Sequence, residues 1–246
     1  QFEKAFTLKN KENYIQFSIG ISRFPKDGKD GNQLLMNADT AMYKAKAGGR
    51  DKYVFYYEEM KEELEEKSKI EGILREALRE DGFVLFYQPQ VDVTTGEIAG
   101  FEALLRLRNF TIPPDLFINI AEETGLITDI GRWVTKEVAD QLVTWREKGL
   151  PLKTVSLNYS SRQLRDTGYI SFLYDLLKTN QLDPGYIEIE ITETSLLEES
   201  VQTLEFLNHL KELGIKIALD DFGVGYSSID YLSYIPANKV KLDKSL

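Results

Sequence analysis

From Phe83 onward, short apolar runs alternate with amphipathic stretches, and this order leaves few folds open. The apolar runs have the length of strands that are buried on both faces, and they lie at 155–158, 187–191, 215–219 and 240–242. The amphipathic stretches repeat apolar residues at helical spacing, and they lie at 128–148, 161–180 and 195–213. Buried strands that alternate with helices predict an α/β fold with a parallel sheet, either open and doubly wound or closed into a barrel.

One segment near the start of this region departs from the alternation. Residues 94–97, Thr-Thr-Gly-Glu, join two strand-like runs with no room for a helix between them. A connection of this length is typical of a β-hairpin. We therefore expect one antiparallel strand pair in an otherwise parallel sheet.

Composition divides the chain into three zones. The first has a strand-like run at 14–22, a helix-like stretch at 31–47 and an aromatic strand at 53–57, too few elements for a complete domain. The second interleaves charged and apolar residues at helical spacing, so we expect one exposed helix that joins two bodies. The predicted parts are 1–57, 58–80 and 81–246.

The residue counts exclude several kinds of site. The 246 residues include no cysteine and one histidine, which argues against disulfide frameworks, thiol nucleophiles and multi-histidine metal centres. With 30 basic and 40 acidic side chains the net charge is −10, so we expect no binding of polymeric nucleic acid and no membrane contact by this chain. The lack of cysteine fits a reducing compartment, and we expect a cytoplasmic protein, with any tether in a region upstream.

Acidic and amide side chains recur near the ends of the predicted strands. Asn158 and Glu190 are 32 positions apart, and Glu190 and Asp220 are 30 apart, close to the length of one βαβ unit. Residues at this interval occupy equivalent places on successive strands, which in a closed barrel form the rim that carries the chemistry. With Glu102 these side chains predict a site for a hard divalent cation, and Asp221 is placed to take a second ion.

Each of these residues also has a simpler interpretation. Asn158 precedes Tyr-Ser-Ser and can cap the helix that follows. Asp220 and Asp221 can serve as turn residues. Four oxygen donors at one depth are harder to explain as separate caps, because carboxylates that cluster without a cation repel one another. Both interpretations therefore stay open on the spacing alone.

Two other residues and one turn are considered as parts of a site. Lys241, in the last predicted strand, can form a salt bridge to neighbouring acids, or it can be the Schiff-base lysine of an aldolase. The Gly223-Val-Gly turn is a weak candidate for binding phosphate through backbone N–H groups. His209 lies in an amphipathic stretch, and we expect it on the surface.

Seven motifs follow one another in the third zone: Phe86-Tyr-Gln-Pro-Gln-Val, Glu102-Ala-Leu-Leu-Arg, Phe117-Ile-Asn-Ile-Ala-Glu-Glu-Thr-Gly-Leu-Ile, Ser156-Leu-Asn-Tyr-Ser, Glu188-Ile-Glu-Ile-Thr-Glu, Asp220-Asp-Phe-Gly-Val-Gly-Tyr-Ser-Ser and Lys241-Leu-Asp. In order and spacing they resemble the EAL family of cyclic di-GMP phosphodiesterases. The first zone resembles the carboxyl-terminal half of a GGDEF diguanylate cyclase domain, through Phe17-Ser-Ile-Gly-Ile-Ser and Asn37-Ala-Asp-Thr-Ala-Met-Tyr-Lys-Ala-Lys. The GGDEF signature loop is absent from this sequence.

The resemblance implies a TIM-like (β/α) barrel with one antiparallel strand, incomplete at the carboxyl terminus, preceded by a partial α/β GGDEF domain. It implies hydrolysis of cyclic di-GMP to linear pGpG by a homodimer that forms through the EAL domain. It also implies a two-metal site for Mg²⁺ or Mn²⁺, inhibited by Ca²⁺, whose ligands are Glu102, Asn158, Glu190, Asp220 and Asp221.

The resemblance assigns roles to further residues. Lys241, Asp221 and Glu193 are the implied catalytic residues: Lys241 orients the attacking water or transfers a proton, and Glu193 steadies the loop that starts at Asp221. Arg106 and Gln88 are the implied substrate-binding residues, with Arg106 on a phosphate.

Three features depart from the family pattern. The segment 107–113 is shorter than the loop that usually follows the arginine of the second motif, and Val224 stands where Thr or Ala is usual. The family also extends beyond its Lys-x-Asp motif through strands that include another catalytic Glu. We therefore expect this chain to be a fragment of a longer protein, without turnover unless another chain supplies the missing strands. These departures leave a receptor that binds cyclic di-GMP without cleaving it, or a protein-interaction module, as the alternative function.

Overall fold

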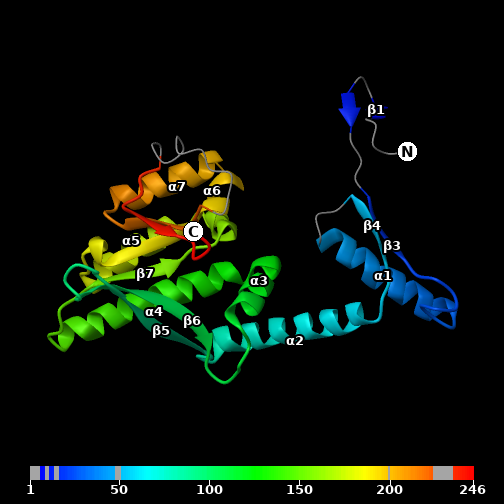
Figure 1. Cartoon of the computed structure of the whole chain (residues 1–246), viewed down its shortest axis with the longest axis horizontal. Helices are drawn as coiled ribbons and strands as arrows, with labels where there is room; N and C mark the ends of the chain where they lie inside the picture. The colour runs from blue at the N-terminus through cyan, green and yellow to red at the C-terminus, as the bar shows by residue number, and fades with distance from the viewer. Residues whose placement is uncertain (1–5, 9–10, 14–16, 48–50, 199, 224–234) are drawn as a thin grey trace. The chain divides into compact units, whose positions relative to one another are not determined.

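The computed structural model describes residues 6–8, 11–13, 17–47, 51–198, 200–223 and 235–246. The chain divides into two units, Gln1–Ile70 and Glu71–Leu246, and each is described by itself. The division falls inside α2 (Glu59–Arg79), the charged helix that the sequence predicts at 58–80 (Figure 1). No helix in the described part of the chain is long and apolar enough to cross a membrane.

The first unit is built on a β–α–β arrangement. Its elements before α2 are β1 (Phe6–Leu8), β2 (Lys11–Asn13), β3 (Ser18–Ile21), α1 (Gly31–Ala47) and β4 (Lys52–Phe55). β3 and β4 pair in parallel, which requires a crossover, and α1 supplies it. The helix lies so close to β3 that a Cβ added at Gly20 would come 1.9 Å from the carbonyl oxygen of Ala38. β1 and β2 form a separate antiparallel pair.

The second unit holds one six-stranded sheet with helices between its strands. Its elements are β5 (Phe83–Val91), β6 (Ile98–Leu107), α3 (Pro114–Thr124), α4 (Ile127–Glu147), β7 (Thr154–Asn158), η1 (Ser161–Arg165), α5 (Tyr169–Asn180), η2 (Pro184–Tyr186), β8 (Ile187–Thr192), α6 (Glu193–Glu198), α7 (Ser200–Glu212), β9 (Lys216–Phe222) and β10 (Lys239–Leu242). The strand order is β10-β9-β8-β7-β6-β5. Within the described part of this sheet only β5 and β6 pair antiparallel, so the predicted α/β class and single antiparallel pair are confirmed.

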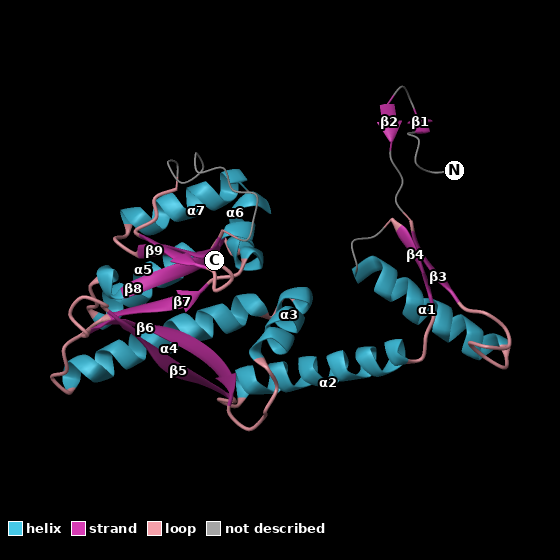
Figure 2. Ribbon diagram, in the orientation of Figure 1, coloured by secondary structure: helices cyan, strands magenta, loops and turns pink. Residues whose placement is uncertain are grey.

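The sheet curls toward itself in the manner of a TIM-like barrel. Nζ of Lys239 on β10 lies 3.1 Å from Oε1 of Gln90 on β5, although these strands stand at opposite ends of the strand order. Helices α4, α5 and α7 lie alongside the strands that they connect (Figure 2). Their apolar stripes and the central strands form the core, so that Val155, Ile189 and Leu142 are fully buried.

Several predicted boundaries were wrong. The stretch 161–180 forms two helices, η1 and α5, because the Asp166 side chain accepts the Gly168 N–H at 3.1 Å and makes a turn between them. The stretch 195–213 is described as α6 and α7, and residue 199 between them lies outside the described residues. β9 continues to Phe222, so Asp220 and Asp221 belong to the strand rather than to a turn after it. The first predicted strand is described only from residue 17 onward.

An ion pair ties α4 to the segment after η1, and it predicts a pH-dependent contribution to stability. Nε and Nη2 of Arg132 each lie 2.7 Å from an oxygen of Asp166. These hydrogen bonds hold the pKa of Asp166 below its ordinary 3.8, against the opposing effect of burial. A carboxyl group with a lowered pKa stabilises the fold above its unfolded pKa, and the stabilisation is lost as the pH falls through the folded pKa.

We expect Asp166→Asn to lower the free energy of unfolding by about 1 kcal/mol at pH 7, because it removes the charge that pairs with Arg132. The effect is no larger because solvent around the partly exposed Arg132 screens the pair. The difference in free energy of unfolding between this variant and the unaltered chain should disappear only below pH 3.8. Urea unfolding at pH values from 3 to 7, in steps of about half a unit, measures this difference. Asp140→Asn, which removes an exposed partner of Lys136, is the control and should change stability by less than about 0.5 kcal/mol. A difference for Asp166→Asn that does not vary with pH would contradict the assignment.

Candidate functional site

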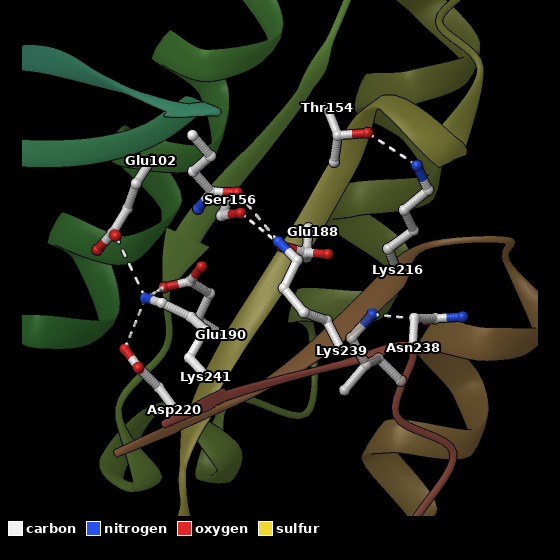
Figure 3. Close-up of polar contacts among 12 residues, drawn as sticks. Glu102, Thr154, Ser156, Glu188, Glu190, Lys216, Asp220, Asn238, Lys239 and Lys241 are labelled. Carbon is white, nitrogen blue, oxygen red and sulfur yellow. Dashed lines mark hydrogen bonds and ion pairs between the residues drawn. The ribbon is translucent and has the colours of Figure 1, made fainter. Parts of the chain in front are cut away.

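Four strands bring charged side chains together around the ammonium group of Lys241 (Figure 3). Lys241 comes from β10 and its three carboxylate partners come from β6, β8 and β9. Nζ of Lys241 lies 3.2 Å from Oε2 of Glu102, 2.6 Å from Oε2 of Glu190 and 2.9 Å from Oδ2 of Asp220. Carboxylates that are 21 to 139 positions from Lys241 in the sequence thus meet at one point of the sheet, as their spacing predicts.

Strand pairing and a hydrogen bond join these residues across a staggered sheet. Glu102 pairs with Ser156 and Asp220 with Thr192, each two residues away from the Asn158–Glu190 pair, and the stagger between strands brings the side chains together. Asn158 is the last residue of β7 and pairs with Glu190 in the parallel register, and on the other side Gln88 of β5 stands opposite Glu102. Nδ2 of Asn158 donates a hydrogen bond of 2.9 Å to Oε1 of Glu102. We call Glu102, Asn158, Glu190, Asp220 and Lys241 the site layer.

The site layer carries excess negative charge. Its three carboxylates face one ammonium, which leaves two negative charges uncompensated. Burial raises the pKa of Glu190, and the neighbouring charges of Glu102 and Asp220 raise it further against the effect of Lys241. Burial by itself would lower the pKa of Lys241, but its hydrogen bonds to the carboxylates outweigh burial, so the pKa lies above its ordinary value. Lys241 is therefore an ammonium at neutral pH, which removes the support for a Schiff-base lysine.

The donor set of the site layer fits a hard divalent cation. Carboxylate and amide oxygens are the ligands that Mg²⁺ and Mn²⁺ prefer. Oε1 of Glu190 is buried and has no hydrogen-bond partner among the described residues, as expected of an oxygen that awaits a ligand. The carboxylates turn toward Lys241, however, and within the described ranges no group of three or more Asp, Glu, His or Cys side chains is gathered as a metal-binding cluster. The ligand roles of these residues stay a prediction.

Asp221 lies near the end of β9, and Glu193, the first residue of α6, contacts the residue that follows this strand. Asp221 has a left-handed backbone with φ of 53°, and its N–H donates to Oδ1 of Asp220 at 3.0 Å. Burial and the charges of Asp220 and Asp243 raise the pKa of Asp221. Oε2 of Glu193 accepts the N–H of Gly223 at 2.8 Å, so this buried carboxylate holds the start of the turn after β9. Val224 and the second glycine of the Gly-Val-Gly turn lie outside the described residues.

A cavity of about 690 Å³ opens beside the site layer. It is lined by Asn158 and Glu190, by Asp221, and by Arg106 on β6. Arg106 donates to the carbonyl of its neighbour Leu105 at 2.7 Å. Gln88 is exposed on β5 and is not among the lining residues. The cavity has room for a ligand of nucleotide size, with a guanidinium group in its wall.

Polar residues beneath the site layer were missed in reading the sequence. Ser156, Glu188 and Lys239 each precede a site-layer residue by two positions, and Gln90 follows Gln88 by two. We call these four residues the second layer. Alternation along a strand sends residues two apart to the same face, so the signal was present in the spacing. His209, by contrast, is exposed in the last turn of α7, as predicted.

The segment after Asn158 is fixed by a buried glutamine. Ser160 caps η1, and its N–H donates to Oε1 of Gln163 at 2.9 Å in a capping box. Gln163 is 3% exposed and lies against Gly131 of α4. A Cβ added at Gly131 would come 1.7 Å from Nε2 of Gln163. Only glycine therefore leaves room for the side chain that anchors this segment.

The family model for the EAL domain matches residues 71–246, and the model for the diguanylate cyclase GGDEF domain matches residues 1–52. The signaling protein YkoW of Bacillus subtilis is 41% identical over 248 residues, covering 100% of this chain and 31% of its own length. The cyclic di-GMP phosphodiesterase PdeR of Escherichia coli is 39% identical, covering 95% of this chain and 35% of its own length. The chain thus spans about a third of these curated relatives. A solved structure described as PaMucR phosphodiesterase in complex with c-di-GMP is 35% identical, with a TM-score of 0.68 over 72% of this chain and 73% of that one.

We expect Gly131→Ala to lower the free energy of unfolding by about 1 to 2 kcal/mol, because the methyl group displaces Gln163 and leaves the Ser160 N–H without its partner. Gly72→Ala is the matched control. Gly72 is exposed on α2 with open space around it, so its replacement should stabilise the chain by about 0.5 to 1 kcal/mol through helix propensity. Thermal unfolding of both variants measures the difference, and equal effects would refute the steric argument.

Proposed function

This chain belongs to the EAL domain family, and we propose that its second unit hydrolyses cyclic di-GMP to linear pGpG with Mg²⁺ or Mn²⁺. The observation that carries the proposal is the meeting of Glu102, Glu190 and Asp220 around one ammonium, beside a cavity with an arginine in its wall. Two relatives support the choice of substrate. PdeR is described as a cyclic di-GMP phosphodiesterase, and the PaMucR structure is described as a phosphodiesterase in complex with c-di-GMP.

Five side chains would hold the metal ions: Glu102, Asn158, Glu190, Asp220 and Asp221. A pair of bound divalent cations supplies activation of water and stabilisation of the leaving oxygen. Two surplus negative charges in the site layer favour such cations. Ca²⁺, with its longer bonds and looser geometry, is expected to bind and to inhibit.

The remaining residues bind and orient the substrate. Arg106 offers a guanidinium group to a phosphate oxygen, and Gln88 is placed for a polar contact at the same end of the sheet. Lys241, held as an ammonium, orients the attacking water by donating a hydrogen bond to its oxygen. Glu193 holds the turn after β9 through Gly223 and thereby positions Asp221.

The overall reaction adds one water across one phosphodiester bond. The water oxygen bonds to phosphorus, the bond from phosphorus to one 3′ oxygen breaks, and a proton goes to that oxygen. The product is linear pGpG, without a covalent enzyme intermediate. We further propose that the functional protein is a homodimer through the EAL domain.

We expect Glu102→Ala and Asp220→Ala in the full-length protein to lower the rate of pGpG formation by at least about a hundredfold, because each removes a proposed metal ligand. Anion-exchange chromatography of reactions with Mg²⁺ or Mn²⁺ measures the product. Asp140→Asn removes a carboxylate from the surface of α4 and should leave the rate unchanged. Unchanged turnover in either site-layer variant would refute the assigned roles.

A receptor that binds cyclic di-GMP without cleaving it is the second candidate. The observation that favours it is the engagement of all three carboxylates by Lys241 within the described residues. Calorimetry with cyclic di-GMP in the presence of Ca²⁺ measures binding, and product analysis with Mg²⁺ measures cleavage. Binding with no pGpG after long incubation would establish the receptor, whereas binding followed by pGpG formation would establish the enzyme.

A further inference from the structure

The second layer contains an ion pair that parallels the one above it. Lys239 of β10 is paired with Glu188 of β8, as Lys241 is paired with Glu190 two residues farther along the same two strands (Figure 3). We call the ion pairs Lys239–Glu188 and Lys241–Glu190 the two rungs. β10 and β8 are not neighbours in the sheet, because β9 lies between them.

Glu188 is held firmly in its place. Its side chain is 3% exposed, and Oε1 accepts the hydroxyl of Ser156 at 2.6 Å in addition to the ammonium of Lys239. A buried carboxylate requires such partners, because the charge is otherwise costly to desolvate. Lys239 also donates to Oε1 of Gln90 at 3.1 Å, so its ammonium is held from β8 and from β5.

The two rungs are close enough to compete. Residues two apart on a strand are separated by about 6.6 Å, which is within the reach of a lysine side chain with four rotatable bonds. Glu188 and Glu190 are both buried, and Lys239 is paired with Glu188. A rotation of the Lys239 side chain toward Glu190 would carry its positive charge into the site layer, so the partner that Lys239 takes decides the net charge there.

We propose that Glu188 and Lys239 are positioning residues that protect the metal affinity of the site layer. Glu188 retains the ammonium of Lys239 in the second layer, so that Lys241 alone contends with a divalent cation for Glu102, Glu190 and Asp220. This inference rests on the proposed metal-dependent function. It adds a role for two residues that contact neither the proposed metal ions nor the substrate cavity.

The two single substitutions have opposite expected effects. Glu188→Gln removes the charge that retains Lys239, whose ammonium then turns to Glu190 and cuts the surplus negative charge of the site layer. Lys239→Met removes the contending ammonium and leaves Glu188 to draw Lys241 away from the upper carboxylates. The first change weakens binding of a divalent cation, and the second does not weaken it. A purely structural ion pair would make both substitutions harmful in the same direction.

Calorimetric titration of the full chain with Mn²⁺ tests the proposal. We expect Glu188→Gln to raise the dissociation constant about tenfold or more, Lys239→Met to leave it unchanged or lower it, and the double variant to lie within about threefold of the unaltered chain. Lys239→Arg, which keeps the charge in the second layer, should also stay near the unaltered value. Thermal unfolding without metal verifies that each variant is folded.

Lys216→Met is the matched control for the loss of a lysine. Lys216 lies on β9 in register with Glu188, but its ammonium donates to the hydroxyl of Thr154 at 2.8 Å and is not part of either ion pair, so its removal should not change Mn²⁺ affinity. Equal losses of affinity in the two single variants and the double variant would overturn the proposal, and so would an unchanged affinity in a folded Glu188→Gln variant. If Glu188→Gln does not fold, weakened binding by Lys239→Met alone overturns it. A lack of Mn²⁺ binding by the unaltered chain would overturn the proposed function itself.

Discussion

The repulsion among three carboxylates at one end of the sheet is the constraint on which the site depends. Glu102, Glu190 and Asp220 approach one another only because the ammonium of Lys241 lies between them. That ammonium comes from β10, the last described strand, whereas the acids come from β6, β8 and β9, which precede it in the sequence. The position of β10 therefore decides whether the acids form one group, and β10 is fixed by its pairing with β9 and by the rung beneath Lys241.

Much of this arrangement is predictable from the sequence, because parallel strands repeat their ends at a regular interval. The spacing of Asn158, Glu190 and Asp220 places them near the ends of successive strands without any coordinates, and the hairpin at 94–97 follows from its length alone. What the spacing cannot reveal is which partner a charged group takes. Lys241 occupies the contacts that the prediction assigned to a cation, since an ammonium and a metal ion both satisfy the same carboxylates.

Helix boundaries and the second layer were less accessible from the sequence for different reasons. The break between η1 and α5 arises from the turn in which the Asp166 side chain accepts the Gly168 N–H, a local contact that competes with an otherwise continuous apolar periodicity. Glu188 and Lys239 were overlooked because charged residues within a strand usually face solvent. Their burial becomes evident only when the sheet curls and brings Gln90 of β5 within reach of β10.

Lys241, at the centre of the site layer, would let folding precede metal binding, two events that many metalloproteins combine. In zinc fingers, the ion itself drives folding, since the ligands repel or remain unorganised without it. Here the ammonium of Lys241, which belongs to the chain itself, neutralises part of the negative charge of the site layer as soon as the sheet forms. Under the proposed metal-dependent function, the unit would fold before it meets its ions and take them up afterwards by exchange with the ammonium, so that scarcity of divalent ions would lower activity rather than stability.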